Sequence, residues 1–337
     1  MRVGIAGASG YAGAELLRLC AGHPELDVVV AGADTQAGQP VAELYPSLAA
    51  AYRGLEFSKV GADDLAQLDV VFLALPHGES QGLAPGLVDR VGVLVDLAAD
   101  FRLRHAESYA QWYGHDHGAP ELLGAFAYGL PELFRAELTG ARLVAAPGCY
   151  PTAAALALAP LVRAGVVEDS GVIVDAASGL SGAGRTLSHT THFNTADEDF
   201  TAYGLLHHRH TPEIEQASGA QVLFTPHLAP MNRGILATCY ARPAVDLDTG
   251  DVLGILREAY EGEPFIVVSE ASPSTKATSG SNCAHLTARV DPRTGWVLTL
   301  CALDNLVKGA SGQAVQCANI ALGIPEATGL PIVGVYP

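Results

Sequence analysis

Short apolar runs alternate with helical segments from Met1 to about Ala146, and this alternation limits most strongly how the chain can fold. The runs are rich in β-branched residues, as the buried strands of a parallel sheet are. They are VGIA, DVVVAG, LDVVFLAL, GVLVDL and RLVAA, and between them AGAELLRLCAGH and SQGLAPGLVDRV have the pattern of crossover helices. This organisation predicts a doubly wound α/β domain with a parallel sheet.

The first expected strand runs into a glycine-rich segment, GIAGASGYAGAEL, at residues 4–16. Its glycines are spaced Gly7-x-x-Gly10-x-x-Gly13, which departs from the strict G-x-G-x-x-G fingerprint. Glycine permits a tight turn there and lets backbone N–H groups approach a pyrophosphate at a helix N-terminus. We therefore expect a Rossmann domain that binds a dinucleotide, and the alternative is a glycine turn that only packs tightly.

The residues after the second expected strand bear on which dinucleotide binds. Asp34 follows that strand, and an acidic residue in this place usually binds the ribose 2′-hydroxyl and favours NAD. Asp34 is equally consistent with a solvated turn. No arginine lies in the loop to bind a 2′-phosphate, although the hydroxyl groups of Ser9 and Thr35 are able to hydrogen-bond one.

The second half of the chain has a different pattern. A helix expected from Pro151 to about Ala164 is followed by strand-like runs, several of which alternate polar and apolar residues as half-buried antiparallel strands do. The runs are GVIVDAAS, QVLFTPHLA, RGILATCYAR, AHLTARV and WVLTLCAL, accompanied by the helical segments TGDVLGILREAYEG and SGQAVQCANIALG. We expect an α+β domain over residues 149–309, with a mixed or antiparallel sheet and helices on one face. The first domain spans residues 1–148, and the C-terminal helical segment 310–337 returns to it.

Charge, hydropathy and cysteine content limit the partners and the compartment. The chain has 19 Lys+Arg against 36 Asp+Glu, and the net charge of −17 disfavours nucleic acid and membrane surfaces as partners. Its longest apolar stretch, residues 152–162, contains Pro160 and is too short to span a membrane. The start, MRVGIAGASG, lacks the order of regions found in a signal peptide. Six cysteines without a CxxC pair fit a reducing compartment, so we expect a cytoplasmic protein.

Cys149 lies in the segment APGCYPTAA, between an expected strand and an expected helix, with Pro151 where the first helical turn should start. A thiol in this place is close to backbone N–H groups and to the positive end of the helix dipole, which lower its pKa and favour the thiolate. The same N–H groups are suited to form an oxyanion site. A buried, unreactive thiol is the alternative interpretation.

The segment LLHHRHTPEIEQ places His207, His208 and His210 around Arg209 and then begins a helix. A nucleophilic cysteine needs a nearby base or acid, and histidine is its usual source. The alternatives are a solvated polar loop and a metal site. We expect no metal, because the spacing of surrounding carboxylates and thiols does not resemble a standard zinc site.

Three further segments look unusual for pure scaffolding. SGLSGAGRT presents Arg185 in a loop of small residues, and APMNRGI places Arg233 at the entrance of a strand. DNLVKGASGQAVQ is a second glycine-rich turn that opens a helix. It indicates either a second cofactor contact or a helix start with a solvated Lys308.

Together these segments closely resemble the N-acetyl-γ-glutamyl-phosphate reductases of arginine biosynthesis, an NADPH-dependent family. The resemblance runs essentially end to end, and its most specific parts are PGCYPT, SGAGR and HRHTPEI. FLALPHG, DLAADFRL, AYGLPEL and NLVKGASGQAVQ also carry it. Aspartate-semialdehyde dehydrogenases share the architecture, but they look different around the cysteine and lack the HRHTPEI run.

The resemblance implies a role for each motif. Cys149 matches the nucleophile that forms a thioester with N-acetylglutamyl phosphate, and His208 or His210 supplies the acid or base, which Glu213 orients. Reduction with NADP(H) then gives the semialdehyde, and the enzymes assemble as homodimers or homotetramers. Substrate anions are expected at Arg102, Arg185 and Arg233. The implied cofactor contacts are Gly7, Ser9, Gly10, Tyr11, Gly13, Thr35, Pro76, Ser181, Gly182, Asn305 and Gly309.

Two departures from the family pattern leave alternatives open. Ala98 replaces the serine of DLSADFR, which removes a local hydroxyl contact, and Asp34 stands where the family often has Ser, Thr or Arg near the 2′-phosphate. A related reductase acting on another acyl phosphate is one alternative function. A dinucleotide-binding redox sensor without catalysis is the other.

Overall fold

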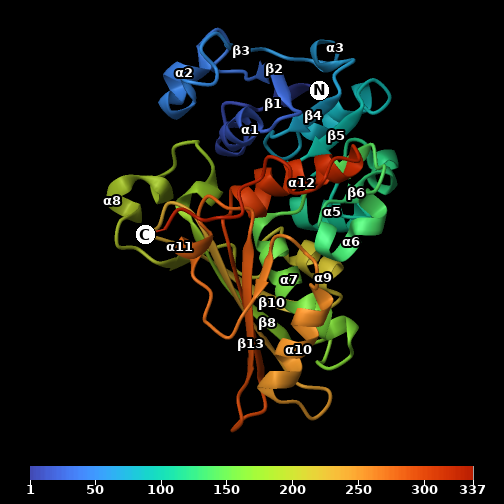
Figure 1. Cartoon of the computed structure of the whole chain (residues 1–337), viewed down its shortest axis with the longest axis vertical. Coiled ribbons are helices and arrows are strands. Elements are labelled where there is room, and N and C mark those ends of the chain that lie inside the picture. Colours follow the sequence, from blue (N-terminus) through green and yellow to red (C-terminus); the bar gives the residue numbers. More distant parts are fainter. Residues whose placement is uncertain (337) are drawn as a thin grey trace. The chain divides into compact units, whose positions relative to one another are not determined.

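The computed structural model describes residues 1–336 and divides the chain into two compact units (Figure 1). Unit 1 contains residues 1–147 and 310–330, and unit 2 contains residues 148–309 together with the chain from Pro331 onward. Each unit has its own seven-stranded sheet.

The sequence predicted that all of residues 310–337 return to the first domain, and the structure corrects this for the final segment. From Pro331 the chain belongs to unit 2 instead, because its backbone forms hydrogen bonds there. The Asn282 N–H donates to the carbonyl of Pro331, and the Val335 N–H donates to that of Ser279, each at 2.7 Å. Pro337 itself lies outside the described residues.

The sheet of unit 1 has the strand order β3-β2-β1-β4-β5-β7-β6, and its strand pairs are parallel. The doubly wound sheet expected from the apolar runs is therefore confirmed. The two-residue strands β3 and β6 have no sequence pattern long enough to predict. The strands are β1 (Arg2–Ala6), β2 (Asp27–Gly32), β3 (Phe57–Ser58), β4 (Val70–Leu73), β5 (Val93–Asp96), β6 (Ala127–Tyr128) and β7 (Leu143–Ala145).

One crossover helix of unit 1 is much shorter than the sequence pattern predicts. The helix expected over residues 80–91 ends after a single turn, α4, and continues as a 3₁₀ turn at Ala84–Gly86. Pro85 lacks an N–H, so it cannot donate the backbone hydrogen bond that would continue the segment as a regular helix. The helices are α1 (Tyr11–Ala21), α2 (Val41–Leu44), α3 (Ala62–Leu65), α4 (Ser80–Leu83), α5 (Ala106–Tyr113), α6 (Pro131–Leu138) and α12 (Gly312–Ala321).

Helix α12 returns to unit 1 through specific contacts. It packs against α1, α6 and β5. At its start, Ser311 Oγ donates to the carbonyl of Ala12 at 2.8 Å, and Gln313 Nε2 donates to that of Gly129 at 2.6 Å. These side chains are fully buried, so the hydrogen bonds satisfy polar groups that would otherwise be costly to bury.

Unit 2 has a mixed sheet with the order β12-β13-β14-β11-β8-β10-β9. The pairs β8–β10 and β12–β13 are parallel, while the others are antiparallel. The mixed sheet expected for the second domain is confirmed. The strands are β8 (Val172–Gly179), β9 (Thr201–Ala202), β10 (Val222–Ala229), β11 (Ile235–Ala241), β12 (Ile266–Val268), β13 (Ala284–Val290) and β14 (Val297–Leu303).

Helices α7 (Cys149–Arg163), α9 (Thr211–Ser218) and α10 (Thr249–Ala259) pack on one face of this sheet (Figure 1). The short helices α8 (Phe193–Ala196) and α11 (Thr275–Thr278) complete the unit. Along β8, β11 and β14, buried side chains alternate with half-buried ones, as expected for a sheet covered by helices on one face. The half-buried, opposite face presents Ile173, Leu236, Tyr240, Leu298 and Leu300.

Candidate active site

The glycine-rich turn of unit 1 joins β1 to α1, and two of its glycines are required by geometry. Gly7 has a φ of 84°, and a Cβ on it would lie 2.2 Å from the carbonyl oxygen of Ala74. A Cβ on Gly13 would lie 2.3 Å from the Gly7 carbonyl oxygen, so this glycine allows the helix to pack on the turn. Gly10 is the N-cap of α1, and the first turn of the helix contains no acidic residue. The turn therefore fits a pyrophosphate group at a helix N-terminus.

A cation lies near the end of β2, although the sequence around β2 does not reveal it. Lys59 follows β3, the strand next to β2, and its Nζ lies 3.3 Å from Oδ1 of Asp34. Both side chains are largely exposed. Thr35 is exposed in the same loop, so a cation and a hydroxyl group accompany the acidic residue there.

The other predicted cofactor residues of unit 1 lie at strand ends and loops. The Ser9 carbonyl accepts a 2.7 Å hydrogen bond from the hydroxyl of Tyr45, and Tyr11 is the exposed first residue of α1. Pro76 lies just beyond the end of β4. These positions are all within unit 1, as a dinucleotide site on this sheet requires.

Arg102 supports backbone in unit 1. The side chain is buried, and its Nε donates to the carbonyl of Ala146 at 2.8 Å while Nη2 donates to that of Leu97 at 2.7 Å. Asp100, two residues earlier, accepts from the N–H groups of Gly78 and Gln81. The single Nε–H of Arg102 is thus used by the carbonyl of Ala146, three residues ahead of Cys149.

Cys149 is the first residue of α7, with Gly148 as its N-cap. The helix thus begins two residues before the predicted start at Pro151, and the thiol belongs to the first turn itself. Cys149 is half-buried, whereas the other five cysteines are buried. Burial raises the pKa of Cys20 and of Cys239 to about 12, so these thiols are poor sources of thiolate.

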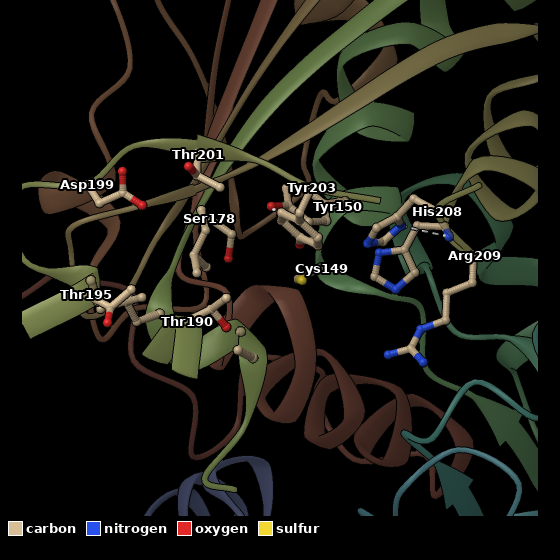
Figure 2. A pocket seen from close by; sticks show the side chains of 16 residues that line it. Cys149, Tyr150, Ser178, Thr190, Thr195, Asp199, Thr201, Tyr203, His208 and Arg209 are labelled. Atoms are coloured by element: carbon tan, nitrogen blue, oxygen red, sulfur yellow. Dashed lines mark hydrogen bonds between the residues drawn. The ribbon is translucent and has the colours of Figure 1, made fainter. Parts of the chain in front are cut away.

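A pocket of about 300 Å³ opens around Cys149 in unit 2. Figure 2 shows the thiol between His208 and Arg209 on one side and Thr190, Thr195 and Asp199 on the other. The predicted residues Cys149, His208, His210 and Gly182 line the pocket. Arg209, which the sequence places between the predicted histidines, also lines the pocket. The other lining residues were not predicted as site residues, although some lie in the predicted motif segments; they are Tyr150, Ser178, Leu180, Ala183, Thr190, Thr195, Ala196, Asp199, Thr201, Tyr203 and Leu228.

The two histidines of the pocket are in contact but differ in position. Their ring centroids are 4.9 Å apart, and Nδ1 of His208 accepts a 3.1 Å hydrogen bond from the backbone N–H of His210 (Figure 2). This bond assigns the proton of neutral His208 to Nε2. Burial, followed by the nearby charge of Arg209, lowers the pKa of His208 to about 4. His208 is therefore uncharged near neutral pH.

Two tyrosines connect this pocket to the sheet. The Tyr150 hydroxyl donates to the carbonyl of His227 at 3.0 Å, and the Tyr203 hydroxyl donates to the hydroxyl oxygen of Tyr150 at 3.2 Å. Burial raises the pKa of Tyr150 well above its usual range and that of Tyr203 to about 12. Both side chains therefore remain protonated and offer hydroxyl groups rather than charges.

Glu213 and Gly309 are closely associated with the cysteine, although neither lines the described pocket. Glu213 is buried, and its Oε1 accepts a 2.8 Å hydrogen bond from the N–H of Gly148. Gly309, predicted as a cofactor contact, packs against Cys149 so closely that a Cβ would lie 2.8 Å from that of the cysteine.

Three further predicted residues, Ser181, Arg233 and Asn305, make hydrogen bonds or ion pairs within unit 2. Asn305 Nδ2 donates to Ser181 Oγ at 2.9 Å, and its Oδ1 accepts from the Gly234 N–H at 2.7 Å. Arg233 Nε lies 3.5 Å from Oδ1 of the buried Asp304. Neither Arg185 nor Arg233 is among the described residues that line the pocket; the arginine there is Arg209.

The chain matches two families of domains in the order that the fold suggests. Residues 2–141 match the semialdehyde dehydrogenase NAD binding domain, and residues 149–305 match the semialdehyde dehydrogenase dimerisation domain. Solved aspartate-semialdehyde dehydrogenases have the same fold at low sequence identity. The enzyme with NADP from Candida albicans aligns with a TM-score of 0.70 at 16% identity, covering 96% of this chain and 98% of that one. The fold and site therefore define a two-domain dehydrogenase of the semialdehyde dehydrogenase class.

Full-length relatives narrow this class. The N-acetyl-gamma-glutamyl-phosphate reductase of Symbiobacterium thermophilum is 51% identical, over 100% of this chain and 99% of the relative. That of Pseudomonas savastanoi is 45% identical, over 100% of both. The chain belongs to the N-acetyl-gamma-glutamyl-phosphate reductase family.

The described residues, 1–336, also bear on membrane insertion and metal binding. None of the helices in this range is long and apolar enough to cross a membrane. Within the same range, His, Cys, Asp and Glu side chains form no group of three or more that could hold a metal ion.

Proposed function

We propose that this chain reduces N-acetyl-L-glutamyl 5-phosphate to N-acetyl-L-glutamate 5-semialdehyde and phosphate with NADPH, in arginine biosynthesis. The observation that carries the proposal is the position of Cys149, at the first residue of a helix and in a pocket with His208, Arg209 and His210. Full-length relatives that carry the reductase name support the choice of substrate.

The first half of the proposed reaction is acyl transfer to the thiolate. Cys149 Sγ attacks the acyl carbonyl, the carbon–oxygen bond to phosphate breaks, and a thioester forms with release of inorganic phosphate. The helix dipole and the N–H groups at the start of α7 favour the thiolate and stabilise the developing oxyanion. Covalent capture divides one difficult step into two easier ones.

The second half reduces the thioester. The thioester on Cys149 would be converted to a thiohemiacetal by the hydride that NADPH would supply when bound. Collapse of this adduct breaks the carbon–sulfur bond and releases the aldehyde and the thiol. We assign the proton transfer to His210, because the lowered pKa of His208 keeps that ring uncharged near neutral pH. His208 then offers its Nε2–H as a hydrogen-bond donor.

The cofactor is proposed to bind unit 1, residues 1–147 and 310–330, with the pyrophosphate at the turn of Gly7, Gly10 and Gly13. Lys59 and Thr35 support NADP over NAD, because an ammonium and a hydroxyl group favour a 2′-phosphate. Asp34 favours NAD instead. Its ion pair with Lys59 is exposed and therefore weak, so both side chains are able to move when a cofactor binds.

Arg209 is the proposed site of the phosphate group. Of the described arginines it alone lines the pocket, beside the thiol proposed to attack the substrate's acyl carbon, which carries the leaving phosphate. The charged, forked guanidinium is well suited to phosphate oxygens. We propose that Arg102 acts instead through the backbone before Cys149, and that Arg185 and Arg233 contact the substrate at the margin of unit 2.

Unit 2 is also the proposed site of assembly into a homodimer or homotetramer. The sheet face opposite the helices leaves apolar residues half-buried, and residues 149–305 match a domain named for dimerisation. Burial of such a face in a second copy would remove apolar surface from water. The six cysteines are all free, which supports the proposal that the protein works in the reducing cytoplasm.

The decisive test follows the reverse reaction, with N-acetylglutamate semialdehyde, phosphate and either NADP⁺ or NAD⁺. We expect phosphate-dependent reduction of NADP⁺ that is abolished by Cys149→Ala. Near-normal kcat in that variant would exclude the thioester route. A preference for aspartate semialdehyde in a substrate panel would favour a related reductase, and a Cys149 no more reactive to iodoacetamide than the other thiols would favour a sensor.

A further inference from the structure

Glu213 joins the start of α9 to the start of α7. It is the third residue of α9, is 1% exposed, and accepts the 2.8 Å hydrogen bond from the N–H of Gly148. Gly148 is the N-cap of α7 and immediately precedes Cys149. One buried side chain thus connects the helix that follows the two histidines to the peptide that carries the thiol.

This connection replaces the usual local arrangement at the start of α9. A glutamate at the third position of a helix commonly accepts from the N-cap N–H of its own helix. Here the N-cap of α9 is His210, and its N–H donates to Nδ1 of His208. The imidazole therefore takes the place of the carboxylate, and Glu213 reaches the N-cap of a different helix.

The contact with Glu213 supplements what the sequence of α7 itself provides at its start, where Thr152 bonds to the carbonyl of Gly148 but not to its N–H. Gly148 has no side chain with which to cap the helix, and Pro151 has no backbone N–H. Glycine at the N-cap also leaves the backbone more conformational freedom than other residues would. An external acceptor that holds the Gly148 N–H restricts this freedom in the residue immediately before Cys149.

We infer that Glu213 is a positioning residue for Cys149, acting through the Gly148 N–H. Its carboxylate accepts the hydrogen bond of the residue next to Cys149, so its negative charge would oppose formation of the thiolate that the helix dipole favours. The family resemblance implies that Glu213 orients a histidine. We extend this role to the positioning of Cys149. The inference rests on the proposed function in taking Cys149 as the nucleophile.

The test compares Glu213→Gln and Glu213→Ala in the full-length protein, with Glu215→Gln and Glu215→Ala as matched controls. Glu215 lies on the same helix and accepts a backbone hydrogen bond from Val222 at 3.1 Å, but it leads to β10 rather than to the cysteine. For each variant we would measure kcat, both KM values, the melting temperature, and the rate of Cys149 alkylation by iodoacetamide against pH.

We expect Glu213→Ala to lower kcat by about 10- to 100-fold, because small misplacements of a nucleophile are costly, with KM for NADPH unchanged. Glu213→Gln retains an oxygen acceptor and should restore most of this loss. Its alkylation curve should shift to lower pH, since the opposing charge is gone. The Glu215 variants should change the melting temperature alone.

Two results would overturn the inference. One is a Glu213→Ala variant with the kcat and alkylation curve of the unmodified protein. The other is a Glu213→Gln variant with an unchanged alkylation curve and a kcat no better than that of Glu213→Ala, a result that remains informative even if the alanine variant fails to fold. Alkylation needs no substrate, so absence of reductase activity in the unmodified protein would count against the proposed function and leave this comparison valid.

Discussion

Gly309 and Cys149 are packed so closely that a Cβ on the glycine would lie 2.8 Å from the Cβ of the cysteine and 3.2 Å from its Cα. Real Cβ atoms do not approach backbone and side chain in this way without displacing them. The second glycine-rich turn of the sequence therefore has a definite role in unit 2. It leaves room for the first turn of α7, where the thiol lies.

The first prediction follows from this packing. Gly309→Ala should displace Cys149 and lower kcat by about 100-fold, because the thiol would no longer be held in its reactive position. Steady-state kinetics together with alkylation of Cys149 would measure this effect. Gly254→Ala is the control, since that glycine lies within α10 with open space around it, and alanine there should stabilise the protein by about 0.5–1 kcal/mol. Equal kcat values in both variants would contradict the prediction.

Substitution of His208 and substitution of His210 should reduce activity to different extents. His210→Ala should lower kcat by about 10²–10⁴-fold as the acid or base, and His208→Ala by less. Measurement of kcat against pH for both variants would test the assignment. A larger loss in the His208 variant would reverse it and identify that residue as the proton donor.

His208 should also make stability depend on pH. Its pKa is lowered from 6.5 to about 4 on folding, so the unfolded chain binds the proton more readily between these values. Stability is therefore retained above about pH 6.5 and falls as the pH decreases toward 4. His208→Gln cannot titrate, and its melting temperature should fall less over this range. Parallel pH dependence in the two proteins would contradict the lowered pKa.

Arg209 provides a test of where phosphate binds. Arg209→Gln should raise the KM for phosphate in the reverse direction by roughly 10- to 100-fold, the loss expected for charge-assisted hydrogen bonds. The KM for the semialdehyde should change little. Arg293→Gln is the control, because Arg293 is exposed and pairs only across a turn with Asp291 in the contacts described. A selective rise in the KM for the semialdehyde would place the substrate carboxylate at Arg209 instead.

A strained residue in unit 1 gives a prediction on stability. Ala99 is buried and has a φ of 115°, a backbone conformation that residues other than glycine rarely adopt. Ala99→Gly should relieve this strain and stabilise the protein by about 1 kcal/mol. The neighbouring Ala98 is equally buried and does not share the positive φ, so Ala98→Gly should destabilise it. Thermal unfolding of both variants would show opposite shifts, and shifts of the same sign would contradict this argument.

Much of the fold was predictable because its signals are local. The apolar runs that became β1, β2, β4, β5 and β7 are contiguous in sequence, as are the glycine turn and the cysteine at a helix start. The expected helix over residues 80–91 was wrong for an equally local reason, because Pro85 interrupts it. The return of α12 to unit 1 was also predicted, but the change of unit at Pro331 depends on backbone partners at Ser279 and Asn282.

The sequence by itself determined the class of fold. It also predicted the proposed nucleophile, Cys149, and the two histidines that line the same pocket, since spacing along one chain places these groups. The tertiary structure decided which groups meet from distant segments. Pairing of β2 with β3 brings Lys59 to Asp34, and packing of α9 beside α7 brings Glu213 to Gly148. Such contacts could not be predicted from the sequence, because they depend on how separate elements pack. Local periodicity contains no information about that packing.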